Sequence, residues 1–138
     1  MNLEELINPN PEITAWFEFK APLVSGLQVE LAYVNPDQFA RFQKQHAGDD
    51  NKTYTRAFLE IAIKNWKGMT FKNVKALVPV KDTKQSDDAE FPFTLNGALA
   101  IASYPNGFWS FILDRVINIR YFQCEDELKN SETGPDGT

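Results

Sequence analysis

Two stretches near the beginning of the chain alternate between apolar and polar residues. In residues 13–20 the apolar positions are Ile13, Ala15, Phe17 and Phe19, and those between them are Thr14, Trp16, Glu18 and Lys20. In residues 27–33 the apolar positions are Leu27, Val29, Leu31 and Tyr33. A period of two predicts β-strands with one buried face, and the intervening Pro22 and Ser25-Gly26 predict the turn of an antiparallel hairpin. Because an isolated hairpin is marginally stable, it must be covered by helices of its own chain or pair with the edge of another sheet.

Further along, apolar residues recur every three or four positions, which is typical of amphipathic helices. About five helices are predicted, most of which begin at a capping residue and end at glycine or proline. The predicted beginnings are Asn35-Pro36, Asn51 or Thr53, Thr70, Thr94 and Asn106, and the ends are Gly48, Gly68, Pro79, Pro105 and, for the last helix, Phe122.

The second of these helices would carry Lys64 and Lys67 in its last turn, where cations favour the helix dipole, with Gly68 as a left-handed C-terminal cap. Trp66 lies off its apolar stripe, so it either covers the edge of the core or is exposed for a partner. The fourth helix has a face of small residues that allows another helix to approach closely. That face consists of Leu95, Ala98, Leu99 and Ala102.

The ends of the chain and one internal segment differ in composition from the rest. Residues 1–11 end in Asn8-Pro9-Asn10-Pro11, which stops any helical turn over residues 3–7 and predicts a loosely docked arm. Residues 80–90 are mostly polar and predict a surface loop. We therefore expect a single α+β domain over residues 1–123, with an N-terminal antiparallel β-hairpin packed against about five α-helices. Residues 124–138 are expected to form a disordered acidic tail.

Composition narrows the class of protein. A chain of 138 residues with 43% hydrophobic residues can bury a core without disulfides or metals. The net charge is −5, and most of it comes from the tail after Cys124, which leaves a nearly neutral body. We therefore expect no nucleic-acid partner. The longest apolar runs fall short of a membrane span, and a single cysteine without a signal peptide predicts a cytosolic protein.

Residues capable of catalysis are scattered. His46 lacks neighbouring ligands at metal spacing, so no metal site is expected. A Cys124 nucleophile with His46 would join residues far apart in the chain, and Asp87-Asp88 lie in a polar loop with no buried surroundings to shift their pKa values. No glycine-rich phosphate loop is present. The sequence predicts a protein that is not an enzyme and has no cofactor.

Five short motifs follow one another at characteristic spacing in residues 58–122. They are Trp66-Lys67-Gly68, Ala76-Leu77-Val78-Pro79-Val80, Asp87-Asp88-Ala89-Glu90, Pro92-Phe93-Thr94 and Tyr104 through Phe108-Trp109. In this order they resemble the tail assembly chaperones encoded in the tail modules of long-tailed bacteriophages. The chain departs from that family after Thr94, where Leu95-Asn96-Gly97 replaces an acidic residue and asparagine. Gly97 weakens the first helical turn by about 1 kcal/mol relative to alanine.

The resemblance implies a noncatalytic protein in the cytoplasm of the infected bacterial host. It would bind the tape-measure protein, help to recruit tail-tube subunits and leave before the virion is complete. A long, apolar, helical tape-measure chain would otherwise aggregate. The candidate contact residues are Trp16, Trp66, Phe108, Trp109 and Tyr121, because aromatic anchors dominate such surfaces. A place in the core or at its edge is the more frequent role of such aromatic residues and is the alternative for each of them, and self-association into a homo-oligomer stays open.

Two other functions fit the same sequence. The first is a structural virion component, such as a tail-completion, neck or connector protein, that uses the hairpin for strand addition to a neighbouring sheet. The second is a bacterial adaptor or antitoxin-like binding module without a phage role. A chaperone would be absent from purified virions, whereas a structural component would be present at a fixed copy number. Neighbouring tape-measure and tube genes would exclude the adaptor.

Overall fold

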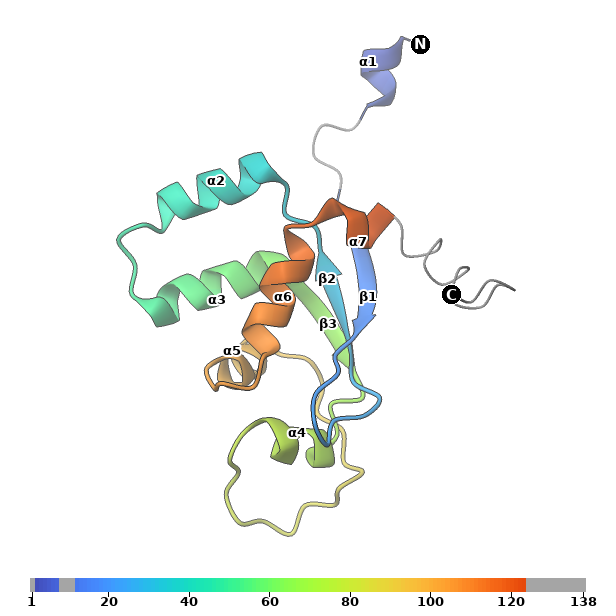
Figure 1. The fold of residues 1–138 in the computed structure, drawn as a ribbon, viewed down its shortest axis with the longest axis vertical. Helices are drawn as coiled ribbons and strands as arrows, with labels where there is room; N and C mark the ends of the chain where they lie inside the picture. Colours follow the sequence, from blue (N-terminus) through green and yellow to red (C-terminus); the bar gives the residue numbers. More distant parts are fainter. Residues whose placement is uncertain (1, 8–11, 124–138) are drawn as a thin grey trace, which may run out of the picture.

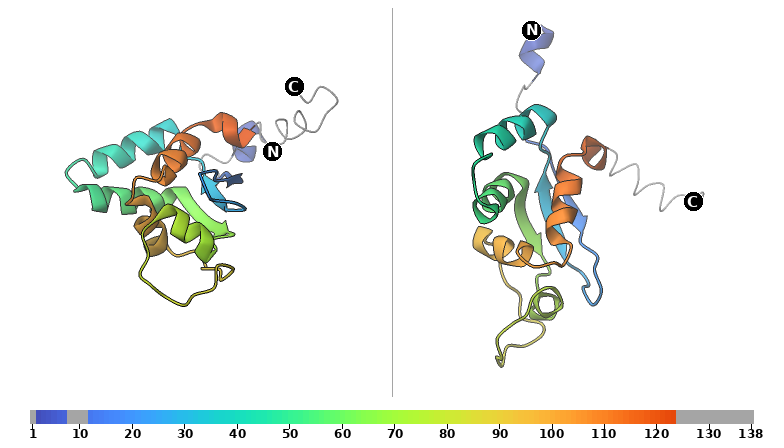
Figure 2. Two further views of the ribbon diagram at one scale, coloured as in Figure 1. Left: turned by 60° about the horizontal axis from the view of Figure 1, so that its bottom comes forward. Right: turned by 60° about the vertical axis from the view of Figure 1, so that its left-hand side comes forward.

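A computed structural model describes residues 2–7 and 12–123. Three antiparallel strands form one sheet in the order β1-β2-β3: β1 (Thr14–Glu18), β2 (Gln28–Ala32) and β3 (Ile63–Lys67). Helices gather on one face of this sheet, as the left-hand view of Figure 2 shows. The predicted α+β class and the N-terminal hairpin are confirmed. The acidic tail lies outside the described residues.

The hairpin has the predicted faces, and its register is fixed by the pairing of β1 with β2. Ala15 lies opposite Leu31, and Phe17 lies opposite Val29. Leu27, Val29 and Leu31 are buried, whereas Thr14, Glu18 and Gln28 are exposed on the other face. The alternation of the sequence therefore gives the sheet an inner face toward the helices and an outer face toward solvent.

The third strand was not predicted, and the assignment of residues 63–67 to the end of a helix was wrong. The helix stops at Ala62, and β3 pairs with β2 through Leu31 opposite Ile63 and Val29 opposite Trp66. A β-bulge at Glu30/Leu31 places the extra residue Lys64 in β3, so Ile63 and Trp66 share the inner face although they are three positions apart. This spacing imitates a helix.

Seven helices fall within the described residues (Figure 1). They are α1 (Leu3–Leu6), α2 (Pro36–Gln45), α3 (Asn51–Ala62), α4 (Phe71–Leu77), α5 (Leu95–Ala102), α6 (Phe108–Val116) and α7 (Ile119–Gln123). The predicted caps Asn35, Thr70 and Thr94 accept hydrogen bonds from the backbone N–H groups of Gln38, Asn73 and Gly97. All described side chains of α1 are exposed.

The single long helix predicted after Asn106 is interrupted in the structure. Gly107 occupies the N-cap position with φ +82°, while Asn106 Oδ1 accepts from the N–H of Phe108 at 3.0 Å. Helix α6 ends at Val116, and a turn at Ile117 and Asn118 leads into α7. Because the chain bends at this point, α7 can fold back over the inner face of β1 through Phe122.

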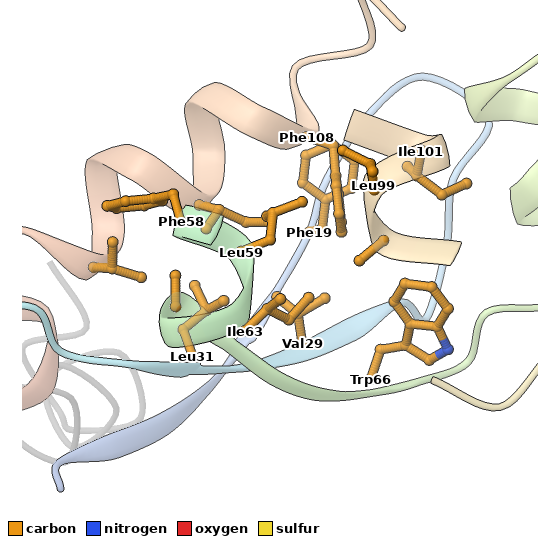
Figure 3. Close-up of a cluster of buried hydrophobic side chains, with 14 of the residues drawn as sticks. Phe19, Val29, Leu31, Phe58, Leu59, Ile63, Trp66, Leu99, Ile101 and Phe108 are labelled. Carbon is orange, nitrogen blue, oxygen red and sulfur yellow. The ribbon is translucent and has the colours of Figure 1, made fainter. Parts of the chain in front are cut away.

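One hydrophobic core joins the sheet to the helices (Figure 3). Phe58 and Leu59 of α3 and Phe108 of α6 are fully buried against the strands. Aromatic rings meet edge to face, with ring centroids 5.4 Å apart for Phe19 and Phe108. This geometry is the favourable one for aromatic pairs. Every element from β1 to α6 therefore contributes to this cluster or packs against it, α4 through Leu77 and β1 through Phe17.

The loop that joins β1 to β2 is held by one buried polar side chain. Asn73 of α4 is 1% exposed. Its Oδ1 accepts from the N–H of Ser25 at 3.1 Å, and its Nδ2 donates to the carbonyls of Ser25 and Gly68 at 2.8 and 2.7 Å. We call these contacts the Asn73 clamp. It fastens the hairpin turn to α4 although the residues are 48 positions apart.

The N-cap of α3 is Asp50, not the predicted Asn51 or Thr53. Hydrogen bonds from the side chain and the backbone of Thr53 to its carboxylate lower the pKa of Asp50 from its usual value of 3.8. A lowered folded-state pKa means that the stabilisation is complete above pH 3.8 and is lost as the pH falls through the folded-state value.

We expect Asp50→Asn, which keeps a capping side chain, to abolish this contribution to the pH dependence while leaving α3 capped at neutral pH. Urea denaturation between pH 2 and pH 7 would measure the free energy of unfolding of both proteins as a function of pH. Identical pH profiles for Asp50→Asn and the parent chain would contradict the assignment.

Candidate interaction surface

The five aromatic residues predicted to contact a partner lie in four different environments. Two of them are core residues. The side chain of Phe108 has no exposed surface, and that of Trp66 is only 7% exposed. The indole Nε1 of Trp66 donates to the carbonyl of Phe91 at 2.8 Å, and its ring meets Phe93 edge to face. The expectation of an exposed contact role for Trp66 and Phe108 does not agree with this conformation.

Trp16 lies at the centre of β1 on the outer face of the sheet. Its ring is half-buried, and the ammonium group of Lys67 sits 4.2 Å from the ring centroid. Such a cation–π contact at a partly exposed site contributes on the order of 0.5–1 kcal/mol. Trp16 is therefore covered in part by its own chain but remains on a face that no described helix covers.

Tyr121 lies on α7 and packs against the body of the protein. Its ring is 6.3 Å from that of Phe17, and the guanidinium carbon of Arg115 lies 4.6 Å from its centroid. Its hydroxyl donates to Asp114 Oδ2 at 3.3 Å. These contacts fix the ring in a half-buried position at the end of the molecule where α6 leads into α7.

Trp109 lines a groove between three helices. The hollow measures about 600 Å³. Its walls are Asn51, Lys52, Tyr54 and Thr55 of α3, Leu99 and Ala102 of α5 with Ser103 beyond it, and Trp109 of α6. Half-buried Trp109 forms the floor, where its ring meets the buried ring of Phe58 edge to face at 5.4 Å. We call this hollow the Trp109 groove.

The Trp109 groove continues into a second hollow of about 380 Å³ at the turn between α5 and α6. Ala102, Ser103 and Trp109 line both hollows. Tyr104, 43% exposed, stands at the far end. The residues that line the two hollows include small side chains, the aromatic rings of Tyr54, Tyr104 and Trp109, and a single charged residue, Lys52.

Several residues of this groove were not singled out from the sequence as contact residues. Tyr54 was assigned to the core-facing stripe of its helix, and Leu99 and Ala102 were assigned to a small-residue face against another helix. The small-residue face was the useful signal, because small side chains leave space beside a large ring. Leu23, at the hairpin turn, was also missed; it is 82% exposed with φ +66°.

The candidate catalytic residues form no reaction centre in the described part of the chain. His46 Nδ1 lies 2.6 Å from Asp49 Oδ2 at the end of α2, and Asp87 pairs with Lys75 on the surface. Cys124 lies outside the described residues. Within residues 2–7 and 12–123, no group of three His, Cys, Asp or Glu side chains could hold a metal ion.

Two further hollows lie outside the Trp109 groove. One, about 560 Å³, lies beside Trp66 and Phe91. The other, about 480 Å³, lies between β2, α2 and α3, with Lys64 bridging to Glu12 at 3.7 Å. Neither combines exposed aromatic rings with a small-residue wall as the Trp109 groove does. In the same residues, no helix is long and apolar enough to cross a lipid bilayer.

A comparison of the chain with protein-family models, curated proteins and solved structures found no match.

Proposed function

We propose that this protein is a noncatalytic tail assembly chaperone of a long-tailed bacteriophage. It acts in the cytoplasm of the infected host, where it binds the tape-measure protein and helps to recruit tail-tube subunits. The observation that carries this proposal is the Trp109 groove, an aromatic channel between helices that matches an apolar stripe of a partner helix.

The dimensions and chemistry of the groove favour a helical ligand. An amphipathic helix presents anchors at i, i+3, i+4 and i+7, and such anchors are received by grooves between helices. Trp109 supplies a rigid aromatic floor, and Ala102 leaves room above it for a leucine or phenylalanine of the partner. Lys52 at the rim would favour an acidic residue beside the partner's apolar stripe.

Two of the five motifs that carry the resemblance to tail assembly chaperones take part in the groove, whose remaining wall comes from the first residues of α3. Thr94 caps α5, which supplies one wall, and the motif from Tyr104 to Trp109 forms the turn and the first residues of α6. Asn106 holds that turn, since its Nδ2 donates to the carbonyls of Leu77 and Ile101 at 3.0 and 2.8 Å. These two motifs therefore lie at the proposed contact surface.

Coexpression with a tape-measure fragment tests the proposal. We expect the intact protein to raise the soluble yield of the fragment, because an apolar helix bound in the groove cannot aggregate. Trp109→Ala should reduce that yield severalfold by removing an aromatic anchor, whose loss typically costs about 2 kcal/mol of binding. Ala102→Lys should have the same effect by filling the groove without creating a cavity.

Phe91→Ala is the matched control, since Phe91 is an exposed aromatic residue, 38% accessible, that lies outside the groove. It should leave the soluble yield unchanged. If Trp109→Ala and Ala102→Lys both fold normally by circular dichroism and both give the same soluble yield of the fragment as the parent chain, this groove is ruled out as the contact surface.

A structural role in the virion is the second candidate, favoured by the exposed edge of β1 at the border of the sheet. Such a component would add β1 to a neighbouring sheet. Mass spectrometry of purified particles separates the two functions, because a chaperone is absent from them and a structural component is present at a fixed, symmetric copy number.

A further inference from the structure

Strand β1 lies at the border of the sheet, and no described residue pairs with its outer side. Figure 1 shows it on the side of the sheet away from β3. The hydrogen bonds at its two ends define which residues face β2: the N–H of Phe19 donates to Leu27 at 2.9 Å, and Ile13 accepts from Tyr33 at 2.8 Å. The odd-numbered residues of β1 thus face β2.

The even-numbered residues therefore direct their backbone groups outward. In an antiparallel ladder, residues that bond to the neighbouring strand alternate with residues whose N–H and C=O groups point the other way. For β1 these are Thr14, Trp16 and Glu18, with Trp16 in the middle. An edge of this kind is a template for another strand.

We propose that β1 pairs antiparallel with β1 of a second copy of this chain, so that two three-stranded sheets join into one of six strands. A two-fold axis passes beside Trp16. In this register Trp16 lies opposite Trp16 of the second copy, and Thr14 lies opposite Glu18. All outward N–H and C=O groups of the three residues then have partners. The interface is isologous, as dimer interfaces with two-fold symmetry are.

Charge complementarity at the ends of the strand selects this register. With Trp16 at the axis, Glu12 lies opposite Lys20 of the second copy, and the pair occurs twice. The Lys20 side chain is 84% exposed and that of Glu12 is 66% exposed, so both can reach across the interface. There the new pair competes with the 3.7 Å contacts that Lys20 makes to Glu18 and Glu12 makes to Lys64 in its own chain. Opposite charges directly across a strand pair stabilise it by roughly 0.2–1 kcal/mol.

The neighbouring registers are less favourable. An axis at Glu18 would set two carboxylates opposite each other, and like charges at that position are destabilising. An axis at Thr14 would set Glu18 opposite Asn10, which lies between Pro9 and Pro11. Prolines cannot donate a ladder hydrogen bond, and they restrict the residue before them. Of these three axes, only the one at Trp16 sets opposite charges across from each other and avoids both a like-charge contact and the prolines.

The inference goes beyond the proposed function and does not depend on it, because the edge of β1 and the Trp109 groove share no residue: the groove is lined by α3, α5, α6 and the turn between α5 and α6.

Analytical ultracentrifugation and hydrogen exchange of the full chain test the proposal. We expect a concentration-dependent monomer–dimer equilibrium. In the dimer, the amides of Thr14, Trp16 and Glu18 should exchange slowly, and dilution should release them. The amides of Ala15 and Phe17, which bond to β2, should stay protected in both states. A monomer at all concentrations up to millimolar, or a dimer in which the three outward amides exchange freely, would overturn the proposal.

A charge exchange across the interface provides a control against misfolding. Lys20→Glu alone and Glu12→Lys alone each place like charges opposite one another at two sites, so each should raise the dimer dissociation constant about tenfold. An equimolar mixture of the two variants restores both opposite-charge pairs and should dimerise as tightly as the parent chain. Failure of the mixture to recover, or pairing of β1 with a different protein while the chain alone stays monomeric, would refute the self-paired edge.

Discussion

Replacement of Gly68 by alanine is expected to lower the free energy of unfolding by about 4 kcal/mol. Gly68 has φ +73°, and a methyl group on its Cα would overlap the carbonyl oxygen of Gly26. The left-handed backbone alone costs an alanine about 1–2 kcal/mol. To relieve the overlap, the hairpin turn must move away, which breaks the Asn73 clamp, and each of its hydrogen bonds contributes about 1 kcal/mol.

Gly26→Ala is the matched control. Gly26 also has a left-handed backbone, φ +69°, but no atom lies within 4 Å of an added methyl group. Only the conformational cost of about 1–2 kcal/mol should be measured there. Urea denaturation followed by tryptophan fluorescence would compare the variants. Equal losses for Gly68→Ala and Gly26→Ala would show that the close approach of the two turns does not contribute to stability.

Truncation of Phe108 is expected to cost about 4 kcal/mol, in the range typical of fully buried phenylalanines. Its ring contacts Phe19, the residue directly after β1, and no part of its side chain reaches solvent. Phe108→Ala would leave a cavity between α6 and the sheet. The loss should appear in urea denaturation as a lower midpoint with an unchanged slope.

The neighbouring Trp109→Ala should cost less, about 2 kcal/mol, because Trp109 is only half-buried. The two replacements therefore test different properties. Phe108→Ala lowers the stability of the fold, whereas Trp109→Ala removes a groove residue from a protein that still folds. A combined replacement of both residues would not test the groove, since unfolding would mask any loss of binding. A midpoint for Phe108→Ala close to that of the parent chain would contradict the assignment of Phe108 to the core.

Local sequence patterns predicted the elements that depend on neighbours in the chain. The hairpin follows from strict alternation, and the caps Asn35, Thr70 and Thr94 follow from side chains that bond within three residues. These features require no knowledge of the rest of the fold. For the same reason, the position of the short helix α4 before Pro79 was predicted correctly.

Strand β3 could not be predicted in this way. Its bulge spaces the two inner-face residues, Ile63 and Trp66, three positions apart, which is a helical spacing and hides the alternation of a regular strand. The choice between strand and helix was decided by the unpaired edge of β2, which lies more than 30 positions earlier and needs a partner. A clue was present in the sequence, since Trp66 fitted the helical stripe poorly.

The candidate surface was predictable only in part. Trp16 and Trp109 were singled out by large apolar side chains outside the main stripes, and their role as contact residues stays a prediction. The burial of Trp66 depends on the carbonyl of Phe91, which satisfies its indole N–H, and nothing near Trp66 in the sequence reveals this partner. The channel beside Ala102 likewise exists only when α5 and α6 meet.

Helix α3 and strand β3 share a peptide bond, since one ends at Ala62 and the other begins at Ile63. No linker separates them, so a rotation of α3 is transmitted directly to β3. A ligand that rotates α3 from the groove side must also shift the sheet edge to which β3 belongs. An extra residue at this joint would turn Ile63 and Trp66 outward, whereas the solvent-facing residues 80–86 can change in number without such a penalty.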